Sequence, residues 1–311
     1  MHPLTVDIPL GQLTAITGVS GSGKSTLLLE SLVPALEGHV LPHVHALSAP
    51  TELRVQVVDS TPIGQNVRST VATYSGVMDE LRKAYAAGTD LRVADFSYNT
   101  GSLACQRCKG TGEITLDVQF LPDVDIVCPD CEGIRYAAAA ATYLHRGISL
   151  PDLMRRTVRE AVAYVDDIPR VHKKLTDLDD LGLGYLTLGE ATPALSGGEA
   201  QRLKLVSQMN RDQTGTLFVL DEPSVGLHPL DVRTLLDVLD QLTRRGATVV
   251  VIEHDLDVIA NADYVIDMGP GGGEDGGRIV ATGTPAEVAT NPTSVTGRYL
   301  AKKLREDANR R

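Results

Sequence analysis

Residues 18–26 read GVSGSGKST and match the phosphate-loop pattern G-x-x-x-x-G-K-S/T. In such a loop the glycines let successive backbone amides converge on phosphate oxygens, and the helix that follows contributes its positive end. Lys24 is therefore predicted to contact the β and γ phosphates of ATP, and the Ser25 hydroxyl to hold Mg²⁺. The other residues predicted to bind the nucleotide are Gly18, Ser20, Gly21, Ser22, Gly23 and Thr26.

The surrounding sequence predicts an α/β fold. Residues 13–17 are a short apolar run that indicates a strand, and apolar side chains then recur at helical spacing from Leu28 to Leu36. In the last third, predicted strands at 217–220, 247–252, 264–268 and 278–282 alternate with predicted helices at 229–245, 255–261 and from Thr284. This alternation predicts a parallel sheet covered by helices.

A second segment supplies groups that ATP hydrolysis requires. Residues 217–223 read LFVLDEP, so Asp221 and Glu222 directly follow a predicted buried strand. We predict that Asp221 reaches the Mg²⁺ ion and that Glu222 orients and deprotonates the attacking water. His254 ends the next strand, where it is placed to contact the γ phosphate, and it completes the catalytic set with Glu222 and Lys24. Taken singly, the Asp-Glu-Pro turn and the histidine also fit ordinary loops; their order after a phosphate loop favours catalysis.

The stretch LSGGEAQR at residues 195–202 contains a helix start. Ser196 and Glu199 have the spacing of a capping box, and the two glycines between them leave the first amides of the helix open to an anion. An ordinary capped helix accounts for the same letters. Downstream of one phosphate loop, however, the stretch resembles the signature of ATP-binding-cassette (ABC) ATPases, in which the signature of one cassette closes on the nucleotide of the other. The resemblance implies an action in trans for Ser196, Gly197, Gly198 and Glu199, and an interface position for residues 224–228.

All four cysteines lie in one segment. Cys105, Cys108, Cys128 and Cys131 follow the pattern C-x2-C-x19-C-x2-C, the spacing of a four-thiolate zinc site. Between the pairs, residues 114–120 alternate between apolar and polar, residues 121–123 turn the chain and residues 124–126 return, which predicts a β-hairpin. Because four protein ligands leave no open position for water, the Zn²⁺ is expected to be structural. Four reduced cysteines without metal are the alternative interpretation.

Composition places the chain among ordinary globular proteins, with 42% hydrophobic and 22% charged residues in a length of 311. The longest apolar runs are far below the roughly 18 residues of a membrane span, and the first ten residues lack a basic-then-apolar signal. A cytoplasmic protein without a membrane partner is therefore expected. The net charge of −11 argues against broad, sequence-independent binding to nucleic acid, which depends on cations that neutralise phosphates. A local DNA contact is still compatible with this charge.

Further motifs accompany the phosphate loop, the signature and the cysteines. They are PIGQNVRSTVATY at 62–74, FLPDV at 120–124, GLGY at 182–185, LDEP at 220–223, GLH at 226–228 and VIEH at 251–254. This combination resembles the C-terminal half of the UvrA family, the damage-sensing ATPases of bacterial nucleotide excision repair. The resemblance runs along almost the whole chain.

The resemblance implies an ABC-type ATP-binding core at residues 1–66 and 212–311, with an inserted helical signature domain at 67–211 that carries a zinc module at 103–136. It also implies that Arg68 contacts the DNA backbone and that the hairpin at 113–127 helps to sense a distorted duplex. The expected cofactors are ATP, Mg²⁺ and structural Zn²⁺.

The activity that the resemblance implies is ATP hydrolysis at a head-to-tail dimer interface. This hydrolysis would be coupled to recognition of damaged or drug-modified double-stranded DNA, in excision repair or in drug self-resistance. The dimer partner would be a second copy or a separately encoded first cassette. A UvrB-type partner is not expected, because its binding region belongs to the first half of the family.

Two positions depart from the family pattern. Ser60 replaces a glutamine that senses Mg²⁺ and the γ phosphate, which predicts weakened hydrolysis, and Gln65 replaces a frequent arginine, which removes one cation from the DNA path. Two alternative functions stay open. The ATPase subunit of an ABC exporter predicts a coupling surface for a membrane protein, and a non-catalytic remnant predicts nucleotide binding without turnover.

Overall fold

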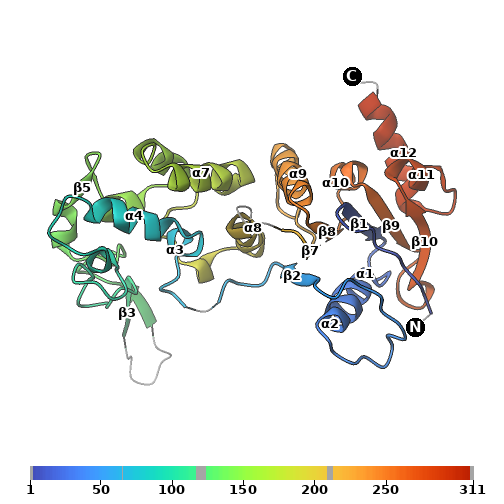
Figure 1. The fold of residues 1–311 in the computed structure, drawn as a ribbon, viewed down its shortest axis with the longest axis horizontal. Helices are drawn as coiled ribbons and strands as arrows, with labels where there is room; N and C mark the ends of the chain where they lie inside the picture. The colour runs from blue at the N-terminus through green and yellow to red at the C-terminus, as the bar shows by residue number, and fades with distance from the viewer. Residues whose placement is uncertain (1–2, 65, 117–123, 209–212, 309–311) are drawn as a thin grey trace. The chain divides into compact units, whose positions relative to one another are not determined.

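The computed structural model describes residues 3–64, 66–116, 124–208 and 213–308. The chain divides into two compact units, one formed by Met1–Ser60 with Gln208–Arg311 and the other by Thr61–Ser207 (Figure 1). The predicted boundaries at 66/67 and 211/212 lie a few residues C-terminal to these divisions. The 211/212 boundary falls outside the described residues, as do Gln65 and the predicted hairpin turn at 121–123.

The first unit is organised around a six-stranded sheet. Its strands in spatial order are β10 (Arg278–Gly283), β9 (Tyr264–Gly269), β1 (Leu13–Gly18), β8 (Thr248–Ile252), β7 (Thr216–Asp221) and β2 (Arg54–Val58). All neighbouring pairs are parallel except β9 with β10. The predicted α/β fold with a parallel sheet is therefore confirmed, with one antiparallel strand at its edge.

Helices cover both faces of this sheet. After the phosphate loop the chain forms α1 (Lys24–Leu27), a π-helical turn (Leu28–Leu32) and α2 (Val33–Leu36), where the sequence predicts one helix. Figure 1 shows α1 and α2 on one side of the sheet, and α9 (Pro229–Arg244) and α10 (Leu256–Asn261) on the other. The unit ends with α11 (Pro285–Thr290) and α12 (Val295–Ala308), of which α12 is absent from the sequence interpretation.

The core of the first unit lies on the central strands. Ile16, Val219, Val250 and Ile266 come from four of these strands and are fully buried. Strands covered on both faces read as continuous apolar runs, as TVVVI does in β8. Burying each such side chain stabilises the fold by roughly 1.5–3 kcal/mol, so the sheet is a rigid base for the loops at its edge.

The second unit is largely helical. Its α-helices are α3 (Val71–Tyr74), α4 (Val77–Ala86), α5 (Leu150–Arg155), α6 (Val158–Ala161), α7 (Pro169–Leu178) and α8 (Gly197–Gln208). Two small antiparallel sheets pair β3 (Glu113–Leu116) with β4 (Val124–Val127) and β5 (Leu144–His145) with β6 (Ile148–Ser149). Thr157 and Glu160 form the predicted capping box of α6, but the helix continues only as a 3₁₀ turn to Tyr164. It ends before the predicted residue 167 because Val165, at φ −128° and ψ 21°, leaves the helical conformation.

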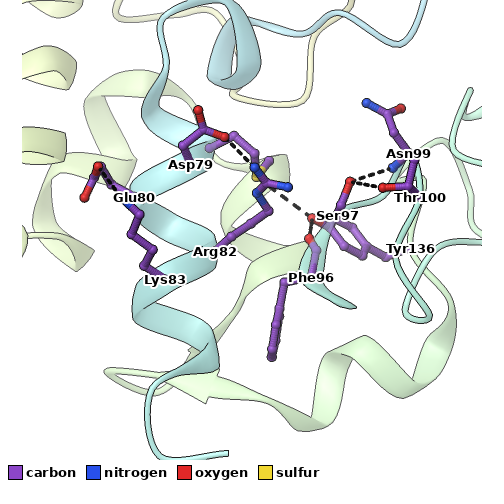
Figure 2. A network of polar contacts seen from close by, with 10 residues as sticks. Asp79, Glu80, Arg82, Lys83, Phe96, Ser97, Asn99, Thr100 and Tyr136 are labelled. Carbon is purple, nitrogen blue, oxygen red and sulfur yellow. Dashed lines mark hydrogen bonds and ion pairs between the residues drawn. The ribbon is translucent and has the colours of Figure 1, made fainter. Parts of the chain in front are cut away.

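Buried aromatic side chains hold the segment that follows α4. The Tyr136 hydroxyl donates a hydrogen bond of 2.8 Å to the Phe96 carbonyl oxygen, and both rings are almost fully buried. Ser97 Oγ accepts from the Asn99 N–H and from the Thr100 hydroxyl, each at 3.3 Å (Figure 2). These bonds fix the backbone of residues 96–100, which carries the Tyr98 ring.

Candidate nucleotide site and metal centre

The phosphate loop, the Asp-Glu pair and the histidine follow three adjacent strands. β8 lies between β1 and β7, and Ile252 at its end is in register with Ile16 on one side and Asp221 on the other. Because the carboxyl ends of parallel strands meet at one edge of a sheet, residues from three distant segments come together there. The sheet order therefore places Gly18, Asp221 and His254 at a common edge.

The backbone of the phosphate loop requires glycine at its first position. Gly18 has a φ of 137°, and a Cβ added there would lie 2.0 Å from the Met268 carbonyl oxygen of β9. Ser22 is fully buried, and its Oγ has no hydrogen-bond partner among the described residues. A glycine-rich turn at a helix start with a spare buried hydroxyl fits a phosphate group, which accepts several hydrogen bonds.

Lys24 lies close over this loop. Only 6% of the residue is exposed, and its Nζ donates hydrogen bonds of 3.0 Å to the carbonyl oxygens of Gly18 and Val19. Burial lowers the pKa of the Lys24 ammonium, and the shift is opposed by the carboxylates of Glu222, Asp221 and Asp267. The ammonium is thus held beside the loop where the β and γ phosphates are predicted.

Carboxylates gather at the end of β7. Burial raises the pKa of Asp221, and the negative charges of Glu222 and Asp59 raise it further. Ser25 is exposed near the start of α1. Mg²⁺ binds one or two carboxylates together with substrate phosphates, so Asp221 and Ser25 fit the ion and would hold it. When bound, Mg²⁺ supplies positive charge against the charge that develops on the transferred phosphate.

Glu222 and His254 lie side by side. Glu222 Oε1 is 3.4 Å from His254 Nε2, and both side chains are about half exposed. Glu222 has a φ of 47°, and its N–H donates to the Ile252 carbonyl oxygen at 2.9 Å. A left-handed conformation is uncommon for a residue with a side chain and concentrates at functional sites. The carboxylate and the imidazole are placed to act on one water or one phosphate oxygen.

The start of α8 carries the predicted capping box. The Ser196 N–H donates to Glu199 Oε2 at 2.6 Å, and the Glu199 N–H donates to Ser196 Oγ at 3.4 Å. The Tyr185 hydroxyl donates a further hydrogen bond to Glu199 Oε1. Burial works to raise the pKa of Glu199, but the hydrogen bonds from Tyr185 and Ser196 outweigh it and lower that pKa. Glu199 is therefore fixed as a carboxylate, while Ser196 stays exposed.

The four cysteines form one buried cluster. Their Sγ atoms all lie within 4.8 Å of one another, at 3.9 Å for Cys105 and Cys128 and 3.6 Å for Cys108 and Cys131. Four sulfurs bonded to a tetrahedral Zn²⁺ at about 2.3 Å would be about 3.8 Å apart. The spacing fits a four-thiolate zinc site, and it is far too long for a disulfide, whose sulfurs are about 2.05 Å apart.

The two cysteine pairs share one local shape. Residues 109–110 and residues 132–133, which follow the second cysteine of each pair, have φ values of 50° and then 83°. Such turns direct backbone N–H groups toward sulfur, and the Gly112 N–H donates to Cys108 Sγ at 3.3 Å. The cluster is therefore shaped for thiolates by two copies of the same turn.

Arg135, four residues after Cys131, fastens the cysteine cluster to two other segments. The residue is 6% exposed. Its Nη1 donates to the carbonyl oxygens of Val67 at 2.7 Å, Thr111 at 2.7 Å and Gly110 at 3.3 Å, and Nη2 contacts that of Gly189 at 3.5 Å. The guanidinium also lies 5.6 Å from the centre of the Tyr98 ring. Burial lowers the pKa of Arg135.

Arg68, the predicted DNA contact, follows directly after Val67. Its backbone carbonyl accepts a hydrogen bond of 2.8 Å from the Tyr98 hydroxyl, so the ring beside Arg135 also holds the backbone of Arg68. A pocket of about 360 Å³ is lined by Asn66, Arg68, Ser69, Thr73, Tyr74 and Asn99. A polar lining with one cation suits a backbone phosphate.

Comparison with known proteins agrees with this geometry. Residues 1–225 match the sequence profile of a protein family described as ABC transporter. The chain belongs to this family. None of its described helices combines the length and apolar character that crossing a bilayer requires.

Within the ABC family, the chain is homologous to UvrABC system protein A. It is 44% identical to that protein from Staphylococcus aureus (strain COL) over 315 residues, and 44% identical to that from Helicobacter pylori (strain J99 / ATCC 700824) over 319 residues. The alignments cover 97% of this chain and 33% and 34% of those proteins. The crystal structure of UvrA2 from Deinococcus radiodurans matches with a TM-score of 0.86 at 44% identity, over 96% of this chain and 37% of that one. The predicted resemblance is confirmed, and the chain spans about a third of the length of its curated relatives.

Three residues at these sites were not found by sequence reasoning. Asp59 adds to the negative charge at Asp221, Arg135 is the buried guanidinium beside the cysteines, and Glu253 is a buried carboxylate beside His254. VIEH at 251–254 was the one available signal for Glu253. Asp59 and Arg135 carry no motif, because their roles come from contacts between segments distant in sequence.

Proposed function

We propose that this chain is a UvrA-like ATPase that binds damaged or adduct-bearing double-stranded DNA and hydrolyses ATP in a head-to-tail dimer. One observation carries the coupling between these two activities. The buried Arg135 joins the four-cysteine cluster to the backbone beside Arg68 and to Gly189, on the segment that leads into α8. The cysteine module, the segment before Arg68 and the segment that precedes the signature thus share one guanidinium.

ATP hydrolysis is assigned to the edge of the sheet in the first unit. The phosphate loop binds the nucleotide, with Lys24 on the β and γ phosphates and with Ser25 and Asp221 on Mg²⁺. Glu222 orients the attacking water and takes its proton, and His254 contacts the γ phosphate. The 3.4 Å between Glu222 and His254 supports a shared task on the same reacting group.

The nucleotide is enclosed by a second cassette in this proposal. Ser196, Gly197 and Gly198 would contact the γ phosphate of the partner's nucleotide, since the start of α8 is a helix N-terminus that attracts anions. Glu199 and Tyr185 hold that helix start in place through the hydrogen bonds described above. The partner is a second copy of this chain or a separately encoded cassette.

DNA is assigned to the second unit. Arg68 and the polar pocket around it would bind a backbone phosphate, which positions a duplex without reading its sequence and so suits lesions of many kinds. Zn²⁺ held by Cys105, Cys108, Cys128 and Cys131 would be structural, because four thiolates fill its coordination sphere. Its task is to fix the base of the β3–β4 hairpin and the backbone that Arg135 holds.

The test measures ATP hydrolysis with a duplex that carries one bulky adduct, with the unmodified duplex and without DNA. We expect the adducted duplex to raise the rate most. Glu222→Gln is expected to lower kcat about 100-fold or more while nucleotide-dependent dimerisation persists. Arg68→Ala is expected to leave the basal rate intact and to weaken the DNA stimulation and its dependence on salt. Lys173→Ala, which removes an exposed lysine paired with Asp177 on α7, is the matched control and should change neither.

The outcomes separate the possible functions. A wild-type rate that is indifferent to duplex DNA would refute the DNA assignment and leave an ATPase of another kind. Binding of nucleotide without hydrolysis, even in single-turnover conditions at high protein concentration, would make the chain a non-catalytic member of the family. Brisk hydrolysis by a protein that stays monomeric would refute the dimer.

A further inference from the structure

Glu253 is a buried carboxylate that the proposed catalytic set does not use. It follows β8 and precedes His254, and only 1% of it is exposed. Its Oε2 accepts hydrogen bonds from Ser224 Oγ at 2.9 Å, from the His254 N–H at 2.9 Å and from the Asp255 N–H at 3.1 Å. Its Oε1 accepts the Ser224 N–H at 2.8 Å.

These contacts join two loops that leave neighbouring strands. His254 and Asp255 lie on the loop after β8, and Ser224 lies on the loop after β7, where it opens the SVGLH segment at residues 224–228. A buried carboxylate is stable only when its oxygens are saturated with donors, and hydrogen bonds to a charged acceptor are stronger than neutral ones. Breaking one such bond would leave a buried charge short of a partner, so the two loops are held together firmly.

The same carboxylate lies beside the predicted catalytic base. The Glu222 N–H donates to the Ile252 carbonyl oxygen at 2.9 Å, and the Glu222 carbonyl oxygen accepts the Val225 N–H at 3.1 Å. Glu222 therefore lies between two residues whose positions are fixed. Asp221 ends β7, and Ser224 is hydrogen-bonded to Glu253. Displacing Ser224 would displace the base as well.

We propose that Glu253 is a positioning residue that makes His254, Glu222 and the loop from Ser224 move as one body. It rests on the proposed function, in which His254 meets the nucleotide and residues 224–228 meet the partner cassette. Docking of the partner against this loop would then place the base and the histidine for hydrolysis. Glu253 itself contacts neither nucleotide nor partner.

The variant Glu253→Gln tests this role because an amide has one acceptor where the carboxylate has two. If the amide oxygen faces the three donors at Oε2, the NH₂ group faces the Ser224 N–H, and donor meets donor. The link to the loop after β7 then loses the bond from the Ser224 N–H and keeps only the one from Ser224 Oγ, while the bonds from His254 and Asp255 both persist. We expect kcat to fall about 10-fold or more, because a loss of about 1.4 kcal/mol of transition-state stabilisation lowers the rate tenfold. The affinity for ATP should stay within about threefold.

Two companion variants complete the design. Glu253→Asp keeps both oxygens on a side chain shorter by one methylene, and it should recover part of the kcat that Glu253→Gln loses. Ser224→Ala removes only the hydroxyl donor, and combined with Glu253→Gln it should lower kcat by less than the product of the single effects, because both weaken the same link between Glu253 and Ser224. Thr284→Ala is the control: it removes the N-cap of α11, lowers Tm and should not change kcat.

Some results would overturn the inference. If folded Glu253→Gln keeps kcat within twofold of wild type, or loses ATP affinity in step with kcat, Glu253 is a structural residue only. If Glu253→Gln does not fold, Glu253→Asp and Ser224→Ala decide the matter, and unchanged kcat in both refutes the proposal. A wild-type protein without turnover removes the proposed function; the inference then stands or falls on whether Glu253→Asp weakens ATP-dependent dimerisation in sedimentation.

Discussion

Replacing Arg135 by methionine tests whether one guanidinium holds the cysteine module, the Arg68 segment and the Gly189 segment together. The substitution keeps an unbranched chain in the buried space but removes the donors. Four carbonyl oxygens, those of Val67, Thr111, Gly110 and Gly189, then lose this partner. The Tyr98 ring also loses the cation that lies 5.6 Å from its centre.

The expected loss follows from the geometry. The bonds to Val67 and Thr111 are both 2.7 Å long and charge-assisted, and hydrogen bonds of this type contribute about 1.5–3 kcal/mol each. Burial disfavours the guanidinium, as its lowered pKa shows, so relief of that burial offsets part of the loss. We expect the free energy of unfolding to fall by about 3 kcal/mol, which corresponds to about 5 °C in Tm for 311 residues at about 2.1 cal/mol/K of unfolding entropy per residue.

The assay is far-UV circular dichroism on heating, because the chain has no tryptophan to report by fluorescence. Release of Zn²⁺ to a chromophoric chelator is followed in parallel and should be faster in Arg135→Met. The matched control is Arg107→Met, which removes an exposed ion pair of 2.8 Å with Asp130 on the same cysteine module and should lower stability by less than about 1 kcal/mol. Equal Tm values and equal zinc release rates in the two variants would refute the reasoning.

Three further predictions follow from other residues. Refolding the chain with a chelator, or substituting Cys128→Ser, should abolish the DNA stimulation of ATP hydrolysis while ATP still binds. Elemental analysis of the wild type should find one zinc per chain. Full stimulation without metal would contradict the prediction. Ser60→Gln, next to Asp59, is expected to raise kcat about two- to tenfold, because the carboxamide of glutamine reaches further toward the predicted γ phosphate than the serine hydroxyl does, and a lower kcat would count against the assignment of Ser60. Because the pKa of Glu199 is lowered in the folded chain, the contribution of Glu199 to stability is present above about pH 4.3 and is lost as pH falls through the folded pKa. Tyr185→Phe removes a hydrogen bond that lowers this pKa, so urea unfolding curves should show the loss of stability at higher pH. Superimposable pH profiles of the two proteins would contradict this prediction.

The elements that sequence predicted well are those whose signal is local. The phosphate loop, the capping boxes at Thr157 and Ser196 and the run of β8 are each specified by residues close together in the chain. α12 had no such signal. Among its residues only Gly297 and Leu300 are buried, so its apolar stripe is too short to stand out in the sequence.

α12 is instead held by a tertiary contact that no periodicity reveals. Ser294 Oγ and Thr296 Oγ1 donate to the two oxygens of the buried Asp267 on β9, at 2.5 Å and 2.9 Å. The same limit applies to the sites. Lys24, Asp221 and the cysteines belong to motifs, whereas Asp59 acts only because β2 lies next to β7 in the sheet.

The two residues that join segments at the proposed sites are buried charges of opposite sign, and each matches the backbone it meets. The loops after β7 and β8 present N–H groups, and the carboxylate of Glu253 has only acceptors. The segments at Val67 and Thr111 present carbonyl oxygens, and the guanidinium of Arg135 has only donors. A neutral side chain can satisfy neither set, since it offers too few groups of the required kind. At both positions, a shorter side chain of the same charge should therefore be tolerated better than a neutral side chain of the same size. A role in packing alone predicts the reverse.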